Sequence, residues 1–165
     1  MKNYWTIFLA TLTLVACSTD ADDDVDSTNG DNALVGTWNL TDVRFDEDPN
    51  DTTLNFADEL VDQLVEDNCF LVTFTFNGDS TVTSTDKLNF VEVNAGPNGL
   101  EVPCPSQSDD LSGTWSLSGN QLTIDDGAGD IRTLTIELNG NILILNGADI
   151  DENNYDGAEA VFTKQ

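Results

Sequence analysis

The sequence predicts an all-β fold, a small up-and-down antiparallel β-barrel of eight to nine strands with one short helix. Segments of alternating apolar and polar residues recur from residue 33 onward, which is typical of half-buried strands. Turn sequences such as Asn77-Gly78-Asp79 and Asn139-Gly140-Asn141 separate many of these segments, as tight hairpins require. Consecutive hairpins close most economically into a barrel, which removes exposed sheet edges. A two-sheet sandwich is the alternative.

The stretch at 111–124 carries the strand pattern most clearly. Its two alternating runs meet at Ser118-Gly119-Asn120, where glycine and asparagine accept the positive φ angles of a tight hairpin. In the first strand the apolar positions change parity after Leu40, which predicts a β-bulge near Thr41 and Asp42. We expect the other strands at 33–45, 69–76, 80–85, 87–94, 131–138, 142–145 and 158–164, and long loops over 95–99 and 102–106.

One segment, 55–66, has helical rather than strand spacing. Its apolar residues recur three and four positions apart, with acidic and amide side chains opposite, so the pattern predicts an amphipathic helix. Asn55 is the expected N-cap. A single helix in a β chain is expected to lie across a barrel end or flank. The apolar stripe comprises Phe56, Ala57, Leu60, Val61, Leu64 and Val65.

The N-terminus has the features of an export signal. Lys2 precedes an apolar run at 7–15 that is too short to span a bilayer. The run ends at Leu14-Val-Ala-Cys17, which resembles the lipobox of bacterial lipoproteins, where the cysteine is lipidated and begins the mature chain. An ordinary secretory signal, or a buried strand with an incidental cysteine, is the alternative. We expect a lipoprotein signal peptide at 1–16, a lipid on Cys17, a disordered acidic tether at 17–32 and a barrel domain at 33–165.

The sequence contains three cysteines. If Cys17 carries a lipid, Cys69 and Cys104 remain as a pair, and an exported chain meets oxidising conditions. A Cys69–Cys104 disulfide is therefore expected, and it would stabilise the fold by about 3–4 kcal/mol on the loop-closure model. A metal site with these two cysteines as ligands is a weaker alternative, because the sequence has no histidine.

The charge balance excludes one class of function. Five basic residues against 31 acidic residues give a net charge of −26, which repels nucleic acid and anionic lipid headgroups. The acidic run after Cys17 resembles the surface-export signals of lipoproteins in some Gram-negative bacteria, although a solvated spacer explains it equally well. We expect an outer-membrane lipoprotein of a Gram-negative bacterium, facing the periplasm or the cell surface, and a monomer.

The residues for catalysis are missing. The sequence has no histidine, and two oxidised cysteines offer no thiolate. Serines lack an activating partner at recognisable spacing. Among 31 acidic residues some pair of carboxylates always lies close together, so such a pair is no evidence for a glycosidase. We expect no enzyme activity and no cofactor.

Calcium is the one metal that the sequence raises. Asp149, Asp151 and Asn153 offer oxygen ligands at alternate positions, as an EF-hand loop begins. The sequence then departs from the EF-hand pattern. Asn154 stands at the position of the invariant glycine, and Ala160 stands at the position of the bidentate glutamate. Solvated hairpin loops rich in aspartate and asparagine explain these residues better.

The order of motifs resembles a known family. Leu34-Val-Gly-Thr-Trp38 is similar to the Gly-x-Trp signature of the first lipocalin strand, and Leu111-Ser-Gly-Thr-Trp115 repeats it. Thr73–Asp79 lies between these two motifs, and Leu122–Ile124 follows the second. In this order of motifs, the chain from about residue 33 resembles the lipocalin-like domain of bacterial lipoproteins. The resemblance implies a ligand-binding or scaffold barrel and supplies no catalytic residue. It implies structural roles for Gly36, Trp38, Gly113 and Trp115.

Two functions follow as hypotheses. In the first, a lipid-anchored barrel binds a small apolar or amphipathic molecule in its lumen, with the helix as a lid. In the second, the barrel is filled, and its outer surface binds a protein or a polysaccharide. The residues expected to line the lumen in the first case, and to pack a filled core in the second, are Phe74, Phe76, Trp115, Leu117, Leu134 and Ile136.

Overall fold

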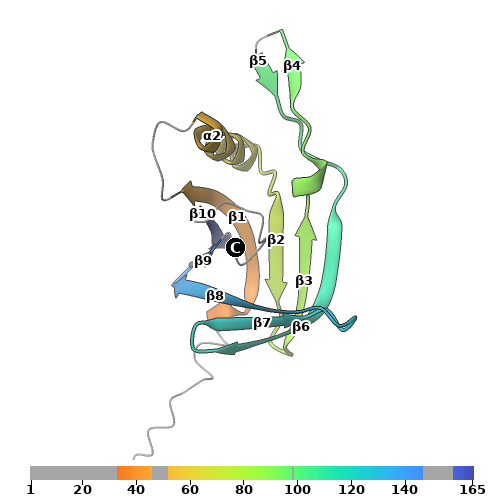
Figure 1. The fold of residues 1–165 in the computed structure, drawn as a ribbon, viewed down its shortest axis with the longest axis vertical. Coiled ribbons are helices and arrows are strands. Elements are labelled where there is room, and N and C mark those ends of the chain that lie inside the picture. Colours follow the sequence, from red (N-terminus) through yellow and green to blue (C-terminus); the bar gives the residue numbers. More distant parts are fainter. Residues whose placement is uncertain (1–32, 46–51, 98, 147–157) are drawn as a thin grey trace, which may run out of the picture.

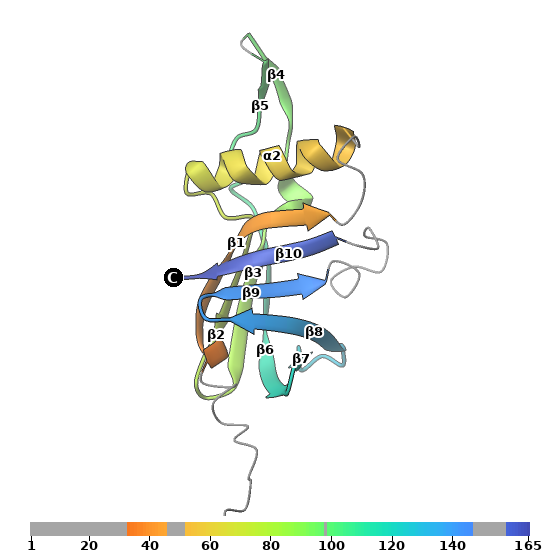
Figure 2. The same ribbon diagram turned by 90° about the vertical axis from the view of Figure 1, so that its left-hand side faces the viewer.

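The computed structural model describes residues 33–45, 52–97, 99–146 and 158–165. Eight antiparallel strands close into one barrel, shown in two views in Figures 1 and 2. The predicted fold class is therefore confirmed, and the sandwich alternative is wrong. The barrel strands are β1 (Gly36–Phe45), β2 (Val72–Phe76), β3 (Thr81–Asp86), β6 (Asp109–Ser118), β7 (Gln121–Asp125), β8 (Ile131–Asn139), β9 (Ile142–Asn146) and β10 (Ala158–Lys164).

The barrel is a simple meander. Strands that follow one another around the ring also follow one another along the chain, and β10 pairs with β1 to close it. The turns at 77–80, 119–120 and 140–141 gather at one end, here called the closed end. The opposite end, here called the mouth, carries the longer connections.

The predicted β-bulge in β1 is confirmed. Leu40 pairs with Phe162 and Asp42 pairs with Val161, so Thr41 is the extra residue in the ladder. Its hydroxyl lies 2.8 Å from the hydroxyl of Thr163. Beyond the bulge β1 pairs only with β10, because its pairing with β2 stops at Asn39.

Helix α2 (Thr52–Glu66) packs along β1 at the mouth, on the side where β1 separates from β2 (Figures 1 and 2). Val61 and Leu64 are buried and belong to the main core cluster. The helix begins before Asn55, so the predicted cap was wrong. The prediction relied on the apolar stripe, which starts at Phe56, and it therefore missed the first turn of the helix.

The helix ends where the sequence predicts, with Asn68 in the left-handed conformation at φ 57°. The N–H of Cys69 donates to the carbonyl of Leu64 at 2.8 Å, and that of Asn68 donates to Val65 at 2.9 Å. These two bonds form a Schellman motif, which satisfies carbonyls at the helix end. The chain thereby turns directly into β2.

The connection between β3 and β6 differs from the prediction of a strand at 87–94. Residues Leu88–Phe90 form the 3₁₀ helix η1, and β4 (Asn94–Gly96) pairs with β5 (Gly99–Glu101) in a separate hairpin. The side chain of Asp86 accepts the N–H of Leu88 at 2.8 Å, which turns the chain out of the sheet. Figures 1 and 2 show this hairpin projecting from the mouth next to α2.

Candidate functional site

Aromatic side chains fill the middle of the barrel. Phe74 lies 5.9 Å from Phe76 and 5.4 Å from Phe162 between ring centroids, and Phe76 meets Trp115 edge to face at 5.5 Å. Phe76 and Phe162 are each 1% exposed. Such packing leaves no room for a ligand at this level.

Two tryptophans hold the closed end together. The indole N–H of Trp38 donates to the carbonyl of Leu34 at 2.7 Å, and that of Trp115 donates to the carbonyl of Asn77 at 3.1 Å. Each ring therefore buries its apolar surface while its polar atom is satisfied. The two Gly-Thr-Trp segments thus have equivalent structural roles.

The two glycines of these segments are required for different reasons. Gly36 has φ 139°, a conformation that side-chain-bearing residues rarely adopt. Gly113 has an ordinary φ, but a Cβ atom there would collide with the backbone carbonyl of Asp125. Gly113 therefore permits the close approach of β6 to the end of β7.

The residues predicted to line the lumen differ in burial. Phe76, Trp115, Leu134 and Ile136 are buried in the core, whereas Phe74 and Leu117 are partly exposed. Leu117 and Ile136 line a cavity of about 590 Å³ at the closed end, together with Ala33 and Leu138. The interior position of the aromatic residues is thus as predicted, but ligand contact stays a prediction.

Several interior side chains toward the mouth are partly exposed. Pairing along β2, β3 and β6 aligns Phe74, Ser84 and Leu111, and Val43 pairs with Ala160 on the same inner surface. All five side chains are partly exposed, and the four apolar ones pack against the core cluster. We call these five residues the upper lumen.

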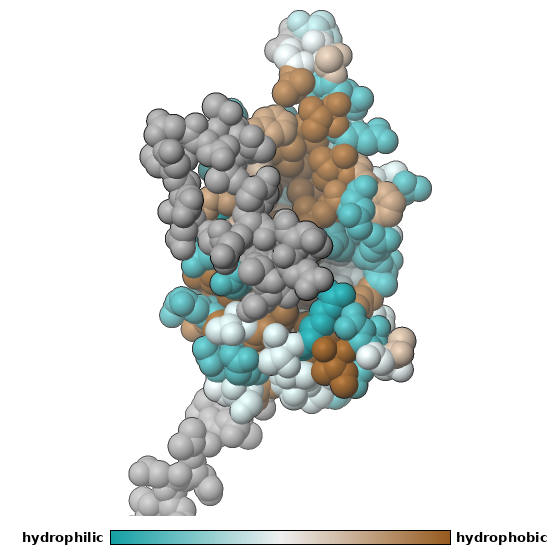
Figure 3. Space-filling view, viewed as in Figure 1, coloured by the Kyte–Doolittle hydropathy of each residue, from teal (hydrophilic) through white to brown (hydrophobic). Residues whose placement is uncertain are grey.

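A second hollow lies at the mouth between α2 and the β4–β5 hairpin. Its volume is about 290 Å³, close to the lower limit for small-molecule pockets. We call it the mouth groove. Figure 3 looks toward the mouth and shows apolar residues gathered below the tip of the hairpin. The groove is lined by Phe56, Glu59, Leu60, Gln63, Leu100 and Val102.

Sequence reasoning did not find the hairpin side of this groove. Leu100 and Val102 flank Glu101 in a region expected to be loop. Their period-two spacing was the available signal, because alternate residues of a strand face the same side. It was too short to stand out against the surrounding glycines and prolines.

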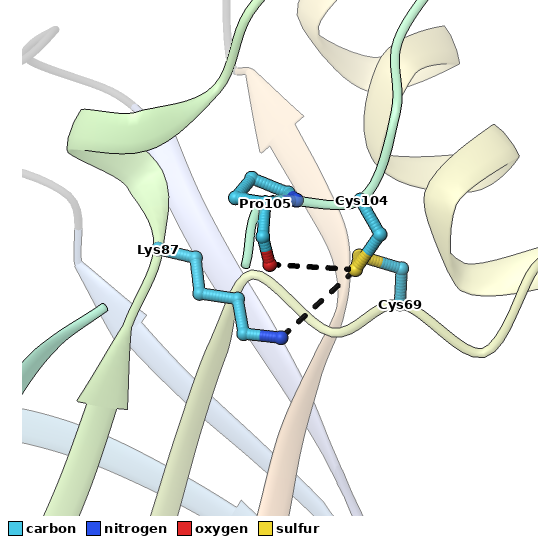
Figure 4. Close-up of a disulfide and its surroundings, with 4 residues drawn as sticks. All are labelled: Cys69, Lys87, Cys104 and Pro105. Carbon is cyan, nitrogen blue, oxygen red and sulfur yellow. Dashed lines mark hydrogen bonds between the residues drawn. A yellow bond between two sulfur atoms is a disulfide. The ribbon is translucent and has the colours of Figure 1, made fainter. Parts of the chain in front are cut away.

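The predicted disulfide joins the two sides of the mouth. Cys69 follows α2 and Cys104 follows β5, with 5.8 Å between their Cα atoms and a sequence separation of 35. Figure 4 shows Lys87 beside this bond, with its Nζ atom 3.9 Å from the Sγ atom of Cys104. The disulfide confines the base of the hairpin next to the helix.

None of the four basic residues after Lys2 lines the mouth groove, and three of them have partners elsewhere. Arg44 pairs with Asp42 at 3.0 Å, and Arg132 pairs with Asp130 at 2.9 Å. Lys164 lies at the closed end, where it donates to the carbonyl of Ala33 at 2.8 Å.

Carboxylates are close enough to influence one another on the barrel side of α2. Burial raises the pKa of Asp58, and the neighbouring carboxylates of Asp62 and Asp42 raise it further. The surface near the helix therefore disfavours additional negative charge.

The calcium loop suggested by Asp149, Asp151 and Asn153 lies outside the described residues, whereas Ala160 lies in β10. Among the described residues, no group of three or more acidic or cysteine side chains is placed to hold a metal ion. In the same part of the chain, no helix has the length and apolar character of a membrane span.

A closed eight-stranded meander barrel with aromatic side chains packed in its middle defines the class of small antiparallel barrels that enclose at most one small ligand. The sequence model of the lipocalin-like domain family matches residues 34–145 of this chain. The chain belongs to this family, as the motif resemblance predicted.

The chain shows a weak similarity to solved structures from Bacteroides species. A lipocalin-like protein from Bacteroides uniformis is 15% identical, with a TM-score of 0.40, over 81% of this chain and 99% of that chain. An uncharacterized protein from Bacteroides eggerthii is 14% identical, also with a TM-score of 0.40, over 79% of this chain and 98% of that chain. No curated protein matches the sequence.

Proposed function

We propose that this protein is a membrane-anchored lipoprotein that binds a small apolar or amphipathic ligand at the barrel mouth and is not an enzyme. The observation that carries this proposal is the contrast between the middle of the barrel and its mouth. Phe76 and Phe162 are buried in the middle of the barrel, whereas the side chains of the upper lumen are partly exposed. Partly exposed apolar side chains inside a barrel favour ligand binding.

The position of the chain's entry into the barrel supports an anchor. Ala33 lies at the closed end, next to Lys164, so a tether from Cys17 would leave the mouth unobstructed. The anchor itself is testable in a Gram-negative host. The wild-type chain should incorporate labelled fatty acid and sediment with outer membranes, and Cys17→Ser should abolish both. Soluble, unlabelled wild-type protein would contradict this part of the proposal.

The absence of enzyme activity is supported by the available side chains. The sequence contains no histidine, and Cys69 and Cys104 are joined to each other. General-base and thiolate chemistry therefore lack their usual groups.

Ligand binding is tested with the uncharged fluorescent probe N-phenyl-1-naphthylamine, added to the chain from residue 17 onward with Cys17→Ser. We expect saturable binding with one probe per chain. Leu111→Trp should abolish binding, because the larger ring fills the upper lumen. Leu117→Trp is the matched control at the closed end and should retain binding.

Thermal unfolding of both variants establishes that they are folded. Failure of the probe to bind, or its loss in the closed-end variant alone, would overturn the assignment to the mouth. Native mass spectrometry of protein purified from its source would then identify any ligand that remains bound.

A second candidate function is a surface interaction module that docks a protein partner. It is favoured by the location of the exposed large apolar side chains, which are all on elements at the mouth end. An interaction module would capture a partner without saturable uptake of the probe. Among the described residues, these side chains are Phe56, Leu88, Val93, Leu100 and Ile131.

A further inference from the structure

We infer that the mouth groove binds a cationic amphiphile whose apolar part lies in the groove and whose positive group lies at Glu59. This site is separate from the upper lumen and goes beyond the proposed function. It follows from three features of the groove: its apolar walls, the carboxylate on its helix face and a lining that contains no basic side chain.

The apolar walls come from elements that the disulfide keeps together. Phe56 and Leu60 belong to α2, and Leu100 and Val102 belong to the hairpin side. Phe56 is 39% exposed and Leu100 is 59% exposed, so both would lose water contact on binding. A volume of about 290 Å³ suits one short apolar chain rather than a folded peptide element.

The polar groups of the groove lie on the helix. Phe56, Glu59, Leu60 and Gln63 are spaced three and four residues apart, so they share one face of α2. That face therefore presents a carboxylate and an amide beside two apolar side chains. A ligand that matches it combines an apolar chain with a group that the carboxylate attracts.

No protein cation occupies this position. All four basic residues beyond Lys2 are described, and none of them lines the groove. Three have partners elsewhere, namely Arg44, Arg132 and Lys164, and Lys87 lies beside Cys104. Among the described residues Glu59 has no ion-pair partner, so its charge is available to a ligand.

The charge of the whole chain acts in the same direction. A net charge of −26 raises the local concentration of cations and disfavours the approach of anions. An anionic amphiphile such as a fatty acid would place its carboxylate beside Glu59. A cationic one gains attraction from both the local carboxylate and the overall field.

The test compares three amphiphiles with the same dodecyl chain: dodecyltrimethylammonium, dodecyl maltoside and dodecyl sulfate. Each is titrated calorimetrically, below its micelle concentration, into the chain from residue 17 onward with Cys17→Ser. We expect one site per chain, and affinity for the cation at least about tenfold above that for the maltoside. Dodecyl sulfate should bind most weakly. Added salt should lower the affinity for dodecyltrimethylammonium and for neither of the other two amphiphiles.

Two charge variants separate a local site from a diffuse field. Glu59→Gln should lower the affinity for dodecyltrimethylammonium about threefold to fivefold and leave dodecyl maltoside unchanged. Glu101→Gln makes the same charge change, but Glu101 lies between Leu100 and Val102 and packs against Gly96, away from the groove. This control should not change either affinity. A bound cation should also raise the melting temperature, which distinguishes binding from surfactant-induced unfolding.

The outcomes are distinguishable. Equal affinities for the three amphiphiles, or equal effects of the two glutamate variants, would overturn the inference and leave the proposed function intact. If none of the amphiphiles binds and the uncharged probe also fails, the proposed function is wrong as well.

Discussion

The ammonium group of Lys164 lies 5.2 Å from the centroid of the Trp38 ring and donates a hydrogen bond to the carbonyl of Ala33. Trp38 itself donates to Leu34. One cation thus covers the buried tryptophan and fixes the chain segment that enters the barrel. This arrangement closes the end of the barrel opposite the proposed ligand site.

Removing the charge of Lys164 should weaken the closed end. We expect Lys164→Met to lower the free energy of unfolding by about 1–2 kcal/mol, since it removes a cation–π contact and a hydrogen bond. Urea unfolding followed by tryptophan fluorescence measures the change. Lys164→Arg, which keeps the charge, should recover most of the stability, and an unaltered midpoint in Lys164→Met would show that the contact contributes nothing.

Gly113 should not tolerate a side chain. A Cβ atom at this position would meet the Asp125 carbonyl and lie 3.1 Å from the Cα atom of Asp126, so we expect Gly113→Ala to cost about 1–3 kcal/mol. Gly78→Ala is the matched control, because nothing lies within 4 Å of its added Cβ. Denaturant midpoints of the two variants should differ clearly, and similar midpoints would contradict the close approach of β6 and β7.

The disulfide should contribute strongly to stability. Breaking it with the double substitution Cys69→Ser and Cys104→Ser should lower the free energy of unfolding by about 3–4 kcal/mol on the loop-closure model, for a separation of 35 residues. Calorimetric melting of the oxidised, reduced and substituted proteins tests this. The reduced wild type and the double variant should melt together; if reduction has no effect, the cross-link is not formed in solution.

Asp126 should make stability depend on pH. Backbone N–H groups of Ala128, Asp130 and Gly129 hold the pKa of this carboxyl below its ordinary value. A depressed pKa in the folded state stabilises the fold above the unfolded-state pKa of about 3.9, and this contribution is lost as pH falls through the folded value.

We therefore expect Asp126→Asn to melt at a lower temperature than the wild type at neutral pH, with the difference shrinking below about pH 4. Asp67→Asn is the matched charge control at an exposed position and should not reproduce this convergence. A difference in melting temperature that stays constant down to strongly acidic pH would contradict the role of the carboxylate.

Much of the barrel could be predicted because its turns are encoded locally. Glycine at 119 and 140 adopts positive φ, and the parity change after Leu40 marks the bulge. The failure at 87–94 has a nonlocal cause. The alternation there resembles a strand, but β6 already occupies the free edge of β3, and Asp86 turns the chain outward.

The candidate site was less accessible to prediction than the fold. Alternation identified Phe74 and Phe76 as interior, but their different exposure depends on neighbours from distant strands, such as Phe162. The mouth groove requires α2 and the β4–β5 hairpin to lie beside each other. That juxtaposition is a tertiary property which neither segment encodes alone.

The adjacency of Ala33 and Lys164 also matters for handling the molecule. The N–H of Gln165 donates to the carbonyl of Thr37 at 3.0 Å, so both ends of the barrel domain emerge at one pole. A sensor surface or fluorescent fusion attached at either end would face away from the mouth. A short linker between these ends would permit circular permutation, with new termini opened in the hairpin that overhangs the groove.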